Sequence, residues 1–332
     1  MDPDDAVTMV ADQADLLTVT QAAPVQRIIN IVVPIGCRSD RGLTEPIITA
    51  LERIPLFNVI TVSLAPDDLH LCRALMRSAC HAADMVLCVA DRQEMLAAAT
   101  VAFEMGKPIG HVYSGILNSI GTRDDIARHI ITLMSDIQFC ESSTARNITI
   151  SLMQRVGLKP NAYDVGITHF DDAKIDESYA PNRDYRVVLY NPVTRGTPAE
   201  ALATTTVEMH EICMMLDKEE MFTYVIGPNP DMEFDYQDLL ARADVFRPNL
   251  DRPKFLGLLS RAKQFITNSS AAIYEAPVVM KRKDREIIHI GLRNRGRFRG
   301  PFRTGASKRI AYLLSGYATQ RFLESGVEKA KG

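Results

Sequence analysis

Residues 27–43 read Arg27-Ile28-Ile29-Asn30-Ile31-Val32-Val33-Pro34-Ile35 and then Gly36-Cys37-Arg38-Ser39-Asp40-Arg41-Gly42-Leu43. The first part is a continuous apolar, β-branched run, which is typical of a strand that is buried on both faces of a sheet. A glycine-containing turn follows, and a helix-like stretch continues to Leu51. This segment therefore predicts one strand–turn–helix unit of a parallel sheet.

The same unit recurs along the chain. In the first half, strands are predicted at 59–64, 85–90 and 109–113, with helices at about 67–82, 93–105 and 126–134. In the second half, strands are predicted at 186–190, 222–227 and 264–267, with helices at about 198–216 and near 254–261. Alternating units of this kind imply parallel sheets with helices on both faces. We expect an α/β fold with two doubly wound, Rossmann-like domains at 27–165 and 185–310. An extension at 1–26, a linker at 166–184 and a C-terminal helix at 311–332 complete the expected organisation.

The composition limits the class of protein. A length of 332 residues suffices for two domains with real cores, and 46% hydrophobic with 24% charged residues is typical of a soluble globular protein. The net charge of −3 predicts no general attraction to nucleic acid or to anionic membranes. An acidic N-terminus and short apolar runs predict a cytoplasmic protein that does not enter a membrane. The six cysteines and the histidines lack metal-binding spacings, so we expect reduced thiols and neither a metal site nor a cofactor.

A second stretch, residues 268–297, contains the side chains that predict a ligand site. A predicted strand runs into Asn268-Ser269-Ser270, and an alanine-rich segment with helical propensity follows. The two serine hydroxyls and the first free backbone N–H groups would face one point, which describes an anion site. Glu275 could accept hydrogen bonds from vicinal hydroxyls, while Arg293 and Arg297 supply donor forks for phosphate oxygens. The stretch therefore predicts a pocket for a nucleoside diphosphate.

Other polar clusters also follow predicted strands, where ligands of open parallel sheets bind. These clusters are 36–40, 91–94, 113–125, 191–194, 228–231 and 268–270. Asp91 opens a helix, so a capping role and a functional carboxylate are equal alternatives for it. Asp125 forms a capping-box pattern with Thr122, and Arg128 with His129 is what an ordinary helix surface carries.

The basic segment 281–303 has two interpretations. A solvated charged face is the usual explanation for such a run. Its glycine spacing favours phosphate contacts for Arg293 and Arg297. A nucleic-acid contact through this segment stays open, although sparse aromatic residues give little support for base stacking.

Several motifs occur in an order that resembles the hydrolysing UDP-N-acetylglucosamine 2-epimerases of the sialic-acid and legionaminic-acid pathways. The matching motifs are Gly36–Asp40, Asp84–Glu94, Asp124–His129, Asn191–Thr194, Pro228–Asp231 and Asn268–Ser270. The resemblance spans about residues 27–300 and implies a GT-B fold with a UDP-sugar bound in the cleft between two domains. It also implies substrate-binding roles for Arg38, Ser269, Ser270, Glu275 and Arg293. The further candidate substrate-binding residues are Asp40, Asn191, Asn229 and Arg297.

The chain departs from the family pattern at two places. Asn191 stands where the family has a histidine, and Tyr113-Ser114-Gly115-Ile116 replaces a glutamate or histidine followed by Gly-Gly-Glu. Asparagine does not carry a proton as histidine does, and isoleucine is neither an acid nor a base. The candidate acid/base residues are therefore Asp91, Asp124 and Asp125.

Three functions are consistent with these residues. The first is hydrolysing 2-epimerisation of UDP-N-acetylglucosamine or a relative, with elimination of UDP and addition of water. The second is a glycosyltransferase that uses a UDP-sugar and an acceptor other than water. The third is a catalytically impaired protein that binds a UDP-sugar. Analogy with the family also predicts a homo-oligomer.

Overall fold

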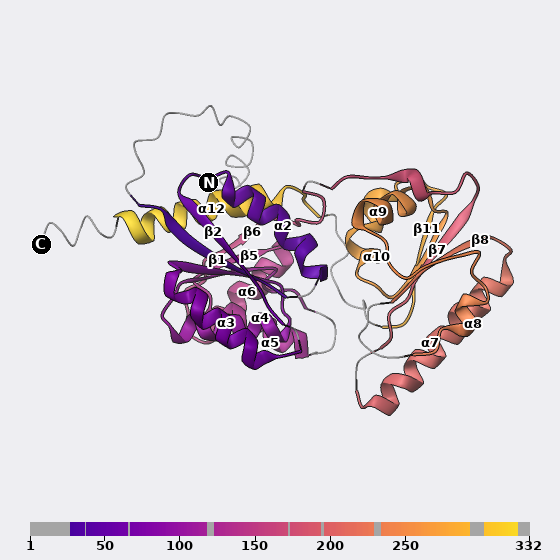
Figure 1. Cartoon of the computed structure of the whole chain (residues 1–332), viewed down its shortest axis with the longest axis horizontal. Helices are drawn as coiled ribbons and strands as arrows, with labels where there is room; N and C mark the ends of the chain where they lie inside the picture. Colours follow the sequence, from indigo (N-terminus) through magenta and orange to yellow (C-terminus); the bar gives the residue numbers. More distant parts are fainter. Residues whose placement is uncertain are drawn as a thin grey trace, which may run out of the picture.

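The computed structural model describes residues 27–36, 38–65, 67–117, 123–171, 173–193, 196–228, 234–292 and 302–324. These residues form two lobes, each built on its own sheet (Figure 1). All strand pairs in both sheets are parallel. The expected pair of doubly wound parallel-sheet domains is therefore confirmed.

The first sheet has the strand order β2-β1-β3-β4-β5-β6. Its strands are β1 (Ile29–Ile35), β2 (Phe57–Ser63), β3 (Met85–Val89), β4 (Ile109–Val112), β5 (Ile137–Cys140) and β6 (Ala162–Asp164). The helices that accompany it are α2 (Arg38–Glu52), α3 (Leu69–Ala82), α4 (Gln93–Glu104), α5 (Arg123–Met134) and α6 (Ser143–Arg155). The helix α12 (Ala306–Thr319) from the end of the chain packs on this lobe beside α2, and the π-helix η3 (Gln320–Glu324) continues it.

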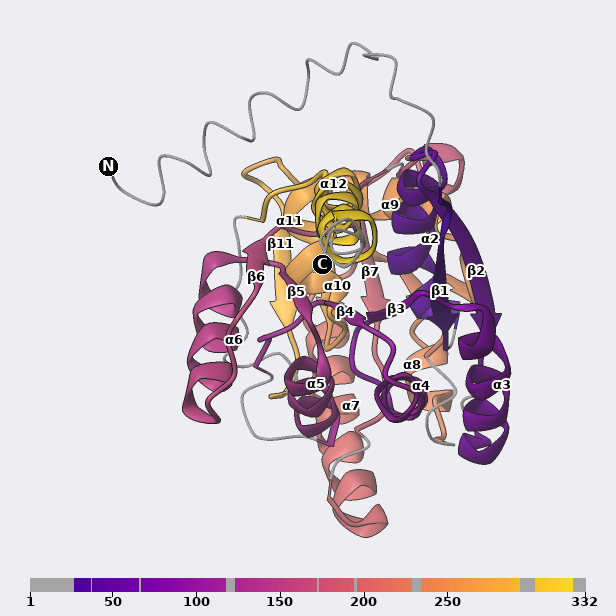
Figure 2. The same cartoon turned by 90° about the vertical axis from the view of Figure 1, so that its left-hand side faces the viewer.

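The first sheet is covered on both faces. Ile29, Ile31 and Val33 on one face belong to a core that includes the buried side of α12. Val32 on the other face joins a core built with α3 and α4. Figure 2 shows α12 and α2 on one face and α3, α4 and α5 on the other. A continuous apolar run such as 27–35 is what a doubly covered strand requires.

The second sheet has the order β11-β10-β7-β8-β9. Its strands are β7 (Tyr185–Leu189), β8 (Phe222–Ile226), β9 (Val245–Arg247), β10 (Gln264–Thr267) and β11 (Glu286–His289). Its helices are α7 (Pro198–Lys218), α8 (Gln237–Leu240), α9 (Arg252–Arg261), α10 (Ala271–Tyr274) and α11 (Ala276–Val279). A short 3₁₀ helix, η2 (Glu177–Tyr179), lies in the connection between the two sheets and packs against α9.

Local sequence signals explain where several helices begin. The side chains of Asp68, Ser142 and Asp251 accept hydrogen bonds from backbone N–H groups in the first turns of α3, α6 and α9. Thr197 and Glu200 form a capping box at the start of α7. The alanine-rich helix expected after Ser270 is only four residues long, because Pro277 opens a separate short helix and has no N–H group to continue the first one.

Candidate active site

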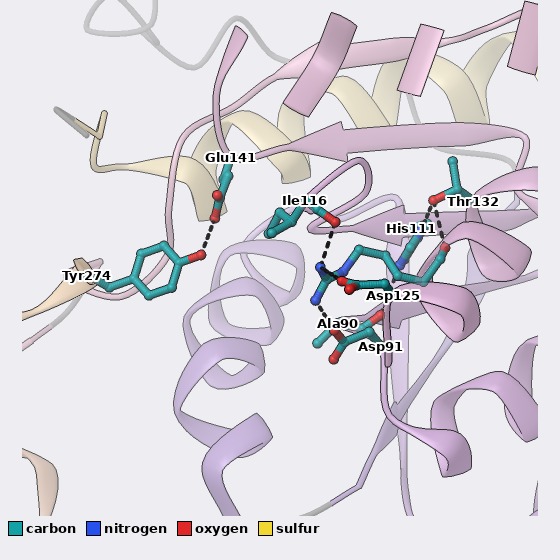
Figure 3. A network of polar contacts seen from close by, with 9 residues as sticks. Ala90, Asp91, His111, Ile116, Asp125, Thr132, Glu141 and Tyr274 are labelled. Carbon is teal, nitrogen blue, oxygen red and sulfur yellow. Dashed lines mark hydrogen bonds and ion pairs between the residues drawn. The ribbon is translucent and has the colours of Figure 1, made fainter. Parts of the chain in front are cut away.

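The predicted acidic residues of the first lobe meet on one arginine. Arg128 of α5 donates from Nη2 to Asp91 Oδ2 and from Nη1 to the Ile116 carbonyl oxygen at 2.8 Å. Its Nη1 also lies 3.7 Å from Asp125 Oδ1. Figure 3 shows Asp91, Asp125 and Ile116 close together, where the chain segments that follow β3 and β4 meet α5. Asp124 is exposed on the same helix.

The burial of Arg128 differs from the interpretation of the sequence, and the two carboxylates differ in exposure. Arg128 is only 4% exposed, so it is not the helix-surface residue that we expected. Two carboxylates and a carbonyl oxygen at its Nη atoms offset the cost of burying this arginine. The Asp91 side chain keeps 15% exposure and that of Asp125 keeps 5%. Asp91 is therefore the carboxylate that a ligand reaches more readily.

The backbone next to Asp91 is held in an uncommon conformation. Ala90 has a φ of 70°, in the left-handed region that non-glycine residues seldom occupy. His111 stabilises it, because its Nε2 lies 2.9 Å from the Ala90 carbonyl oxygen while Nδ1 lies 3.0 Å from Thr132 Oγ1. Burial lowers the pKa of His111 to about 4, so the ring is neutral at physiological pH. Backbone strain of this kind clusters at functional sites.

Tyr113 also has a left-handed backbone, with a φ of 68°. Its hydroxyl group lies 2.8 Å from Thr168 Oγ1 and accepts a hydrogen bond from the Thr168 N–H group at 3.1 Å. His169 Nδ1 is 3.3 Å away. Burial is the main reason that the pKa of Tyr113 is raised, so this hydroxyl stays protonated. Tyr113 therefore acts as a fixed structural group here.

In the second lobe, the Asn-Ser-Ser segment lies at the end of β10. The Asn268 side chain binds both backbone groups of Asn191: Oδ1 accepts from the Asn191 N–H group at 2.9 Å, and Nδ2 donates to the Asn191 carbonyl oxygen at 2.7 Å. This pair joins the ends of β7 and β10. Ser269 and Ser270 are the two partly exposed residues in an otherwise buried run from Phe265 to Ala276. Ser269 Oγ accepts a hydrogen bond from the Ala271 N–H group at 3.3 Å, and both serines stay partly exposed.

Glu275 is buried and already has a partner. Arg252 of α9 lies 3.1 Å from Glu275 Oε1 through Nη1, and its Nη2 donates to the His169 carbonyl oxygen at 2.6 Å. Burial raises the pKa of Glu275, and the charge of Arg252 opposes this rise. Sequence reasoning did not find Arg252. The Gly42 position of α2 lies close to the same guanidinium group, so Arg252 stands at the junction of the two lobes.

The two lobes meet at Tyr274. Its hydroxyl group donates to Glu141 Oε2, at the end of β5, over 2.8 Å (Figure 3). Its ring stacks on His169, with centroids 4.4 Å apart and planes 18° from parallel. Burial lowers the pKa of His169 to about 3, so the stack contains a neutral imidazole. Sequence reasoning missed Glu141, His169 and Tyr274.

Some predicted residues cannot be placed in this geometry. Asn229, Arg293 and Arg297 lie outside the described residues, as does Thr122 of the expected capping box. Arg38 and Asp40 are in the first turn of α2, directly after β1, but only their backbone is described. Their position agrees with a place at the same sheet edge as Asp91.

The described residues contain no group of three or more histidine, cysteine or acidic side chains arranged to hold a metal ion. Five cysteines in these ranges, Cys72, Cys80, Cys88, Cys140 and Cys213, are buried free thiols. Among the described helices, none combines the length and the apolar character that a membrane span requires.

A sequence model of the UDP-N-acetylglucosamine 2-epimerase family matches residues 73–309, which is well over half of the chain. The chain belongs to this family. Two curated relatives are bacterial. The hydrolysing UDP-N,N'-diacetylbacillosamine 2-epimerase of Legionella pneumophila is 23% identical over 210 residues, or 58% of this chain and 53% of that protein. The hydrolysing GDP/UDP-N,N'-diacetylbacillosamine 2-epimerase of Campylobacter jejuni is 27% identical over 234 residues, or 65% and 58%. The chain thus matches little more than half the length of these relatives.

Solved structures agree on the fold of this 2-epimerase family member. The structure of Staphylococcus aureus MnaA with UDP superposes with a TM-score of 0.66 over 88% of each chain, at 16% sequence identity. Identity at this level shows the fold alone. Both lobes are Rossmann-like α/β domains, and together they have the GT-B arrangement that we expected.

Proposed function

We propose that this protein binds a UDP-sugar between its two lobes and inverts the configuration at C2 of a 2-acetamido sugar, with release of UDP. The observation that carries the proposal is the pairing of Asp91 and Asp125 on the buried Arg128, at the strand ends of the first lobe. Membership of the 2-epimerase family supports the substrate class. The bound UDP in the Staphylococcus aureus relative supports the nucleotide.

The second lobe supplies the nucleotide pocket in this proposal. Ser269 and Ser270 bind the diphosphate through their partly exposed hydroxyls, and Arg38, Arg293 and Arg297 add phosphate contacts. Glu275 accepts hydrogen bonds from the ribose hydroxyls, and Arg252 then contacts both Glu275 and the ligand. Asp40, Asn191 and Asn229 complete the proposed substrate-binding residues. Diphosphate binding stabilises the group that leaves when the C1–O bond breaks.

Inversion at C2 requires the C2–H bond to break and a new C2–H bond to form on the opposite face. The C2 proton of a sugar is a very weak acid, so its loss is coupled to departure of UDP from C1, which leaves a C1=C2 double bond. Asp91 is the base for this step, because it is the more exposed carboxylate of the Arg128 cluster. Water then adds across the double bond, with a proton going to C2 and a hydroxyl group to C1.

Incubation of the protein with UDP-N-acetylglucosamine tests this reaction. We expect release of free UDP and appearance of N-acetylmannosamine, both detected by chromatography. In ²H₂O, deuterium should enter the product at C2, because the proton returns from solvent. The Asp91→Asn variant should lose at least about a hundredfold in kcat while UDP affinity stays within about twofold. A UDP-linked epimer without free UDP would contradict the hydrolysing reaction.

One observation favours a second function, that of a UDP-sugar-binding protein without turnover. The Tyr113 hydroxyl group is fully occupied by Thr168 and His169, and Asn191 cannot transfer protons as a histidine would. Calorimetry separates the two functions. Micromolar binding of UDP-N-acetylglucosamine with no free UDP after prolonged incubation, and no effect of Asp91→Asn beyond affinity, would favour binding alone.

A further inference from the structure

The short helix α10 belongs to the second lobe by sequence but packs into the first. Ile273 and Tyr274 are members of the core cluster formed by β1, β3, β4, β5 and α12 of the first lobe. Both residues are buried. They lie between Ser270 and Glu275, which we assign to the nucleotide pocket. The segment that holds the nucleotide is therefore attached directly to the lobe that carries Asp91.

One polar contact fixes this attachment. The Tyr274 hydroxyl group donates to Glu141 Oε2 at 2.8 Å, and the two residues are 6% and 4% exposed. A hydrogen bond between two buried groups is stronger than an exposed one, because the protein interior has a low dielectric constant. Glu141 directly follows β5, which lies beside β4 in the sheet. The contact thus joins the α10 segment to the strand ends where the proposed chemistry takes place.

Other contacts beside this hydrogen bond also hold the α10 segment in place. His169, from the connection between the lobes, stacks on the Tyr274 ring on one side. Arg252 joins the His169 carbonyl oxygen to Glu275, the residue that follows α10. The segment is therefore restrained at two consecutive residues, Tyr274 and Glu275, by groups from the connection and from both lobes.

We propose that Tyr274 and Glu141 are positioning residues for the reaction: their hydrogen bond across the two lobes sets the distance between the UDP leaving group and Asp91. This inference rests on the proposed function and adds two residues to it. A displacement of about 1 Å between reacting groups lowers rates by as much as a hundredfold. Loss of the bond should therefore reduce kcat and leave the affinity for UDP nearly unchanged.

Four variants test the proposal. Tyr274→Phe removes the hydroxyl group and keeps the ring that stacks on His169, while Glu141→Ala removes the acceptor. Each should lower kcat about tenfold to a hundredfold with UDP affinity within about twofold by calorimetry, and the double variant should be no slower than either one. Glu141→Gln keeps a carbonyl oxygen that accepts the Tyr274 hydrogen bond, so it should recover most of the wild-type kcat.

A matched control is available in the second lobe. The buried Tyr185 hydroxyl group donates to the Leu258 carbonyl oxygen at 2.6 Å within that lobe. Tyr185→Phe loses a hydrogen bond of similar burial that does not connect the lobes, so its kcat should match that of the wild type. A wild-type kcat in Tyr274→Phe would overturn the proposal. An inactive Glu141→Gln would do the same, because it would make Glu141 a proton-transfer group.

A second measurement is independent of turnover. Amide hydrogen exchange in the protein without ligand should be faster across residues 271–276 in Tyr274→Phe, while β7 stays as protected as in the wild type. If the wild-type protein binds UDP but releases none from UDP-N-acetylglucosamine, the proposed function fails, and the exchange comparison still decides whether the Tyr274–Glu141 hydrogen bond fixes the position of residues 271–276. Unchanged exchange in 271–276 would then reject it.

Discussion

At the scale of single residues, Asn268 fixes the geometry of the strand ends in the second lobe. Its side chain makes hydrogen bonds to both backbone groups of Asn191 and is 1% exposed. We expect Asn268→Ala to lower the free energy of unfolding by about 2–4 kcal/mol, because two buried backbone groups lose their bonds to this side chain.

Urea denaturation followed by circular dichroism measures this change. Asn268→Asp keeps the acceptor for the Asn191 N–H group but places a carboxylate against the Asn191 carbonyl oxygen, so it should also destabilise the protein. A change below about 0.5 kcal/mol in both variants would contradict the structural role given to Asn268.

Individual residues also show which parts of the site could be predicted from the sequence and which could not. Asp91 and Asp125 were found because each follows a strong strand or helix-start signal. Arg128 was interpreted as a surface residue, because the sequence does not reveal which side of a helix faces two carboxylates. Tyr274 lies between the predicted residues Ser270 and Glu275, yet its hydroxyl group has a partner that is 133 residues away in the sequence. Contacts of such separation depend on how two domains pack and leave no local signal.

At the scale of elements, the strand β4 carries a buried neutral histidine. The pKa of His111 is about 4 in the folded protein, whereas histidine in an unfolded chain titrates near 6.5. Between these values the unfolded state binds one more proton, so the free energy of unfolding falls as the pH falls. From pH 6.5 to pH 5, this residue alone should remove about 1.5 kcal/mol of stability.

The variant His111→Gln isolates this contribution. Denaturation curves at pH 5, 5.5, 6 and 6.5 should show a smaller dependence on pH in the variant than in the wild type. His169 is present in both proteins, so its own contribution cancels in the comparison. An equal dependence of stability on pH in the two proteins would mean that the pKa of His111 is not lowered by folding.

Two helical glycines should respond in opposite directions to alanine. A Cβ atom at Gly257 of α9 would lie 1.9 Å from the Asp176 carbonyl oxygen, in the connection that packs on this helix. We expect Gly257→Ala to destabilise the protein by about 2 kcal/mol or more. Gly316 of α12 has nothing within 4 Å of its Cβ position, so Gly316→Ala should stabilise by about 0.5–1 kcal/mol. Thermal unfolding of both variants measures these changes, and a stabilised Gly257→Ala would contradict the close packing.

Element prediction succeeded where apolar runs were long. The strand at 27–35 is continuous enough to identify a buried parallel strand, and β3 and β8 are similar. The strands β5, β6, β9 and β11 have three or four residues each and were not predicted. Runs of this length are too short for a clear period, and among the four-residue strands only β4 and β10, which lead into polar motifs, were predicted. Glu141 was missed for this reason, because it follows β5.

At the scale of the whole molecule, the end of the chain completes the first lobe. After the second sheet the chain returns, and α12 packs beside α2 with Ile310, Ala311 and Leu314 in the core of the first lobe (Figure 2). Asp171 accepts hydrogen bonds from the Gly305 and Ser307 N–H groups at the start of this helix. The first domain is therefore discontinuous in sequence, which the alternation of strands and helices could not reveal.

This arrangement predicts which part of the molecule depends on α12. Leu314 is fully buried against the first sheet, whereas Tyr312 on the same helix is 58% exposed. Leu314→Asp places a charge in an apolar core, so it should destabilise the first lobe by about 4 kcal/mol or more, and Tyr312→Asp should change stability by less than about 1 kcal/mol. Hydrogen exchange locates the damage. In Leu314→Asp the amides of β1, β3 and β4 should lose protection before those of β7 and β8, because Leu314 lies in the core of the first sheet. Equal loss in both sheets would mean that the lobes unfold as one unit, and loss confined to the second sheet would place α12 in the other domain.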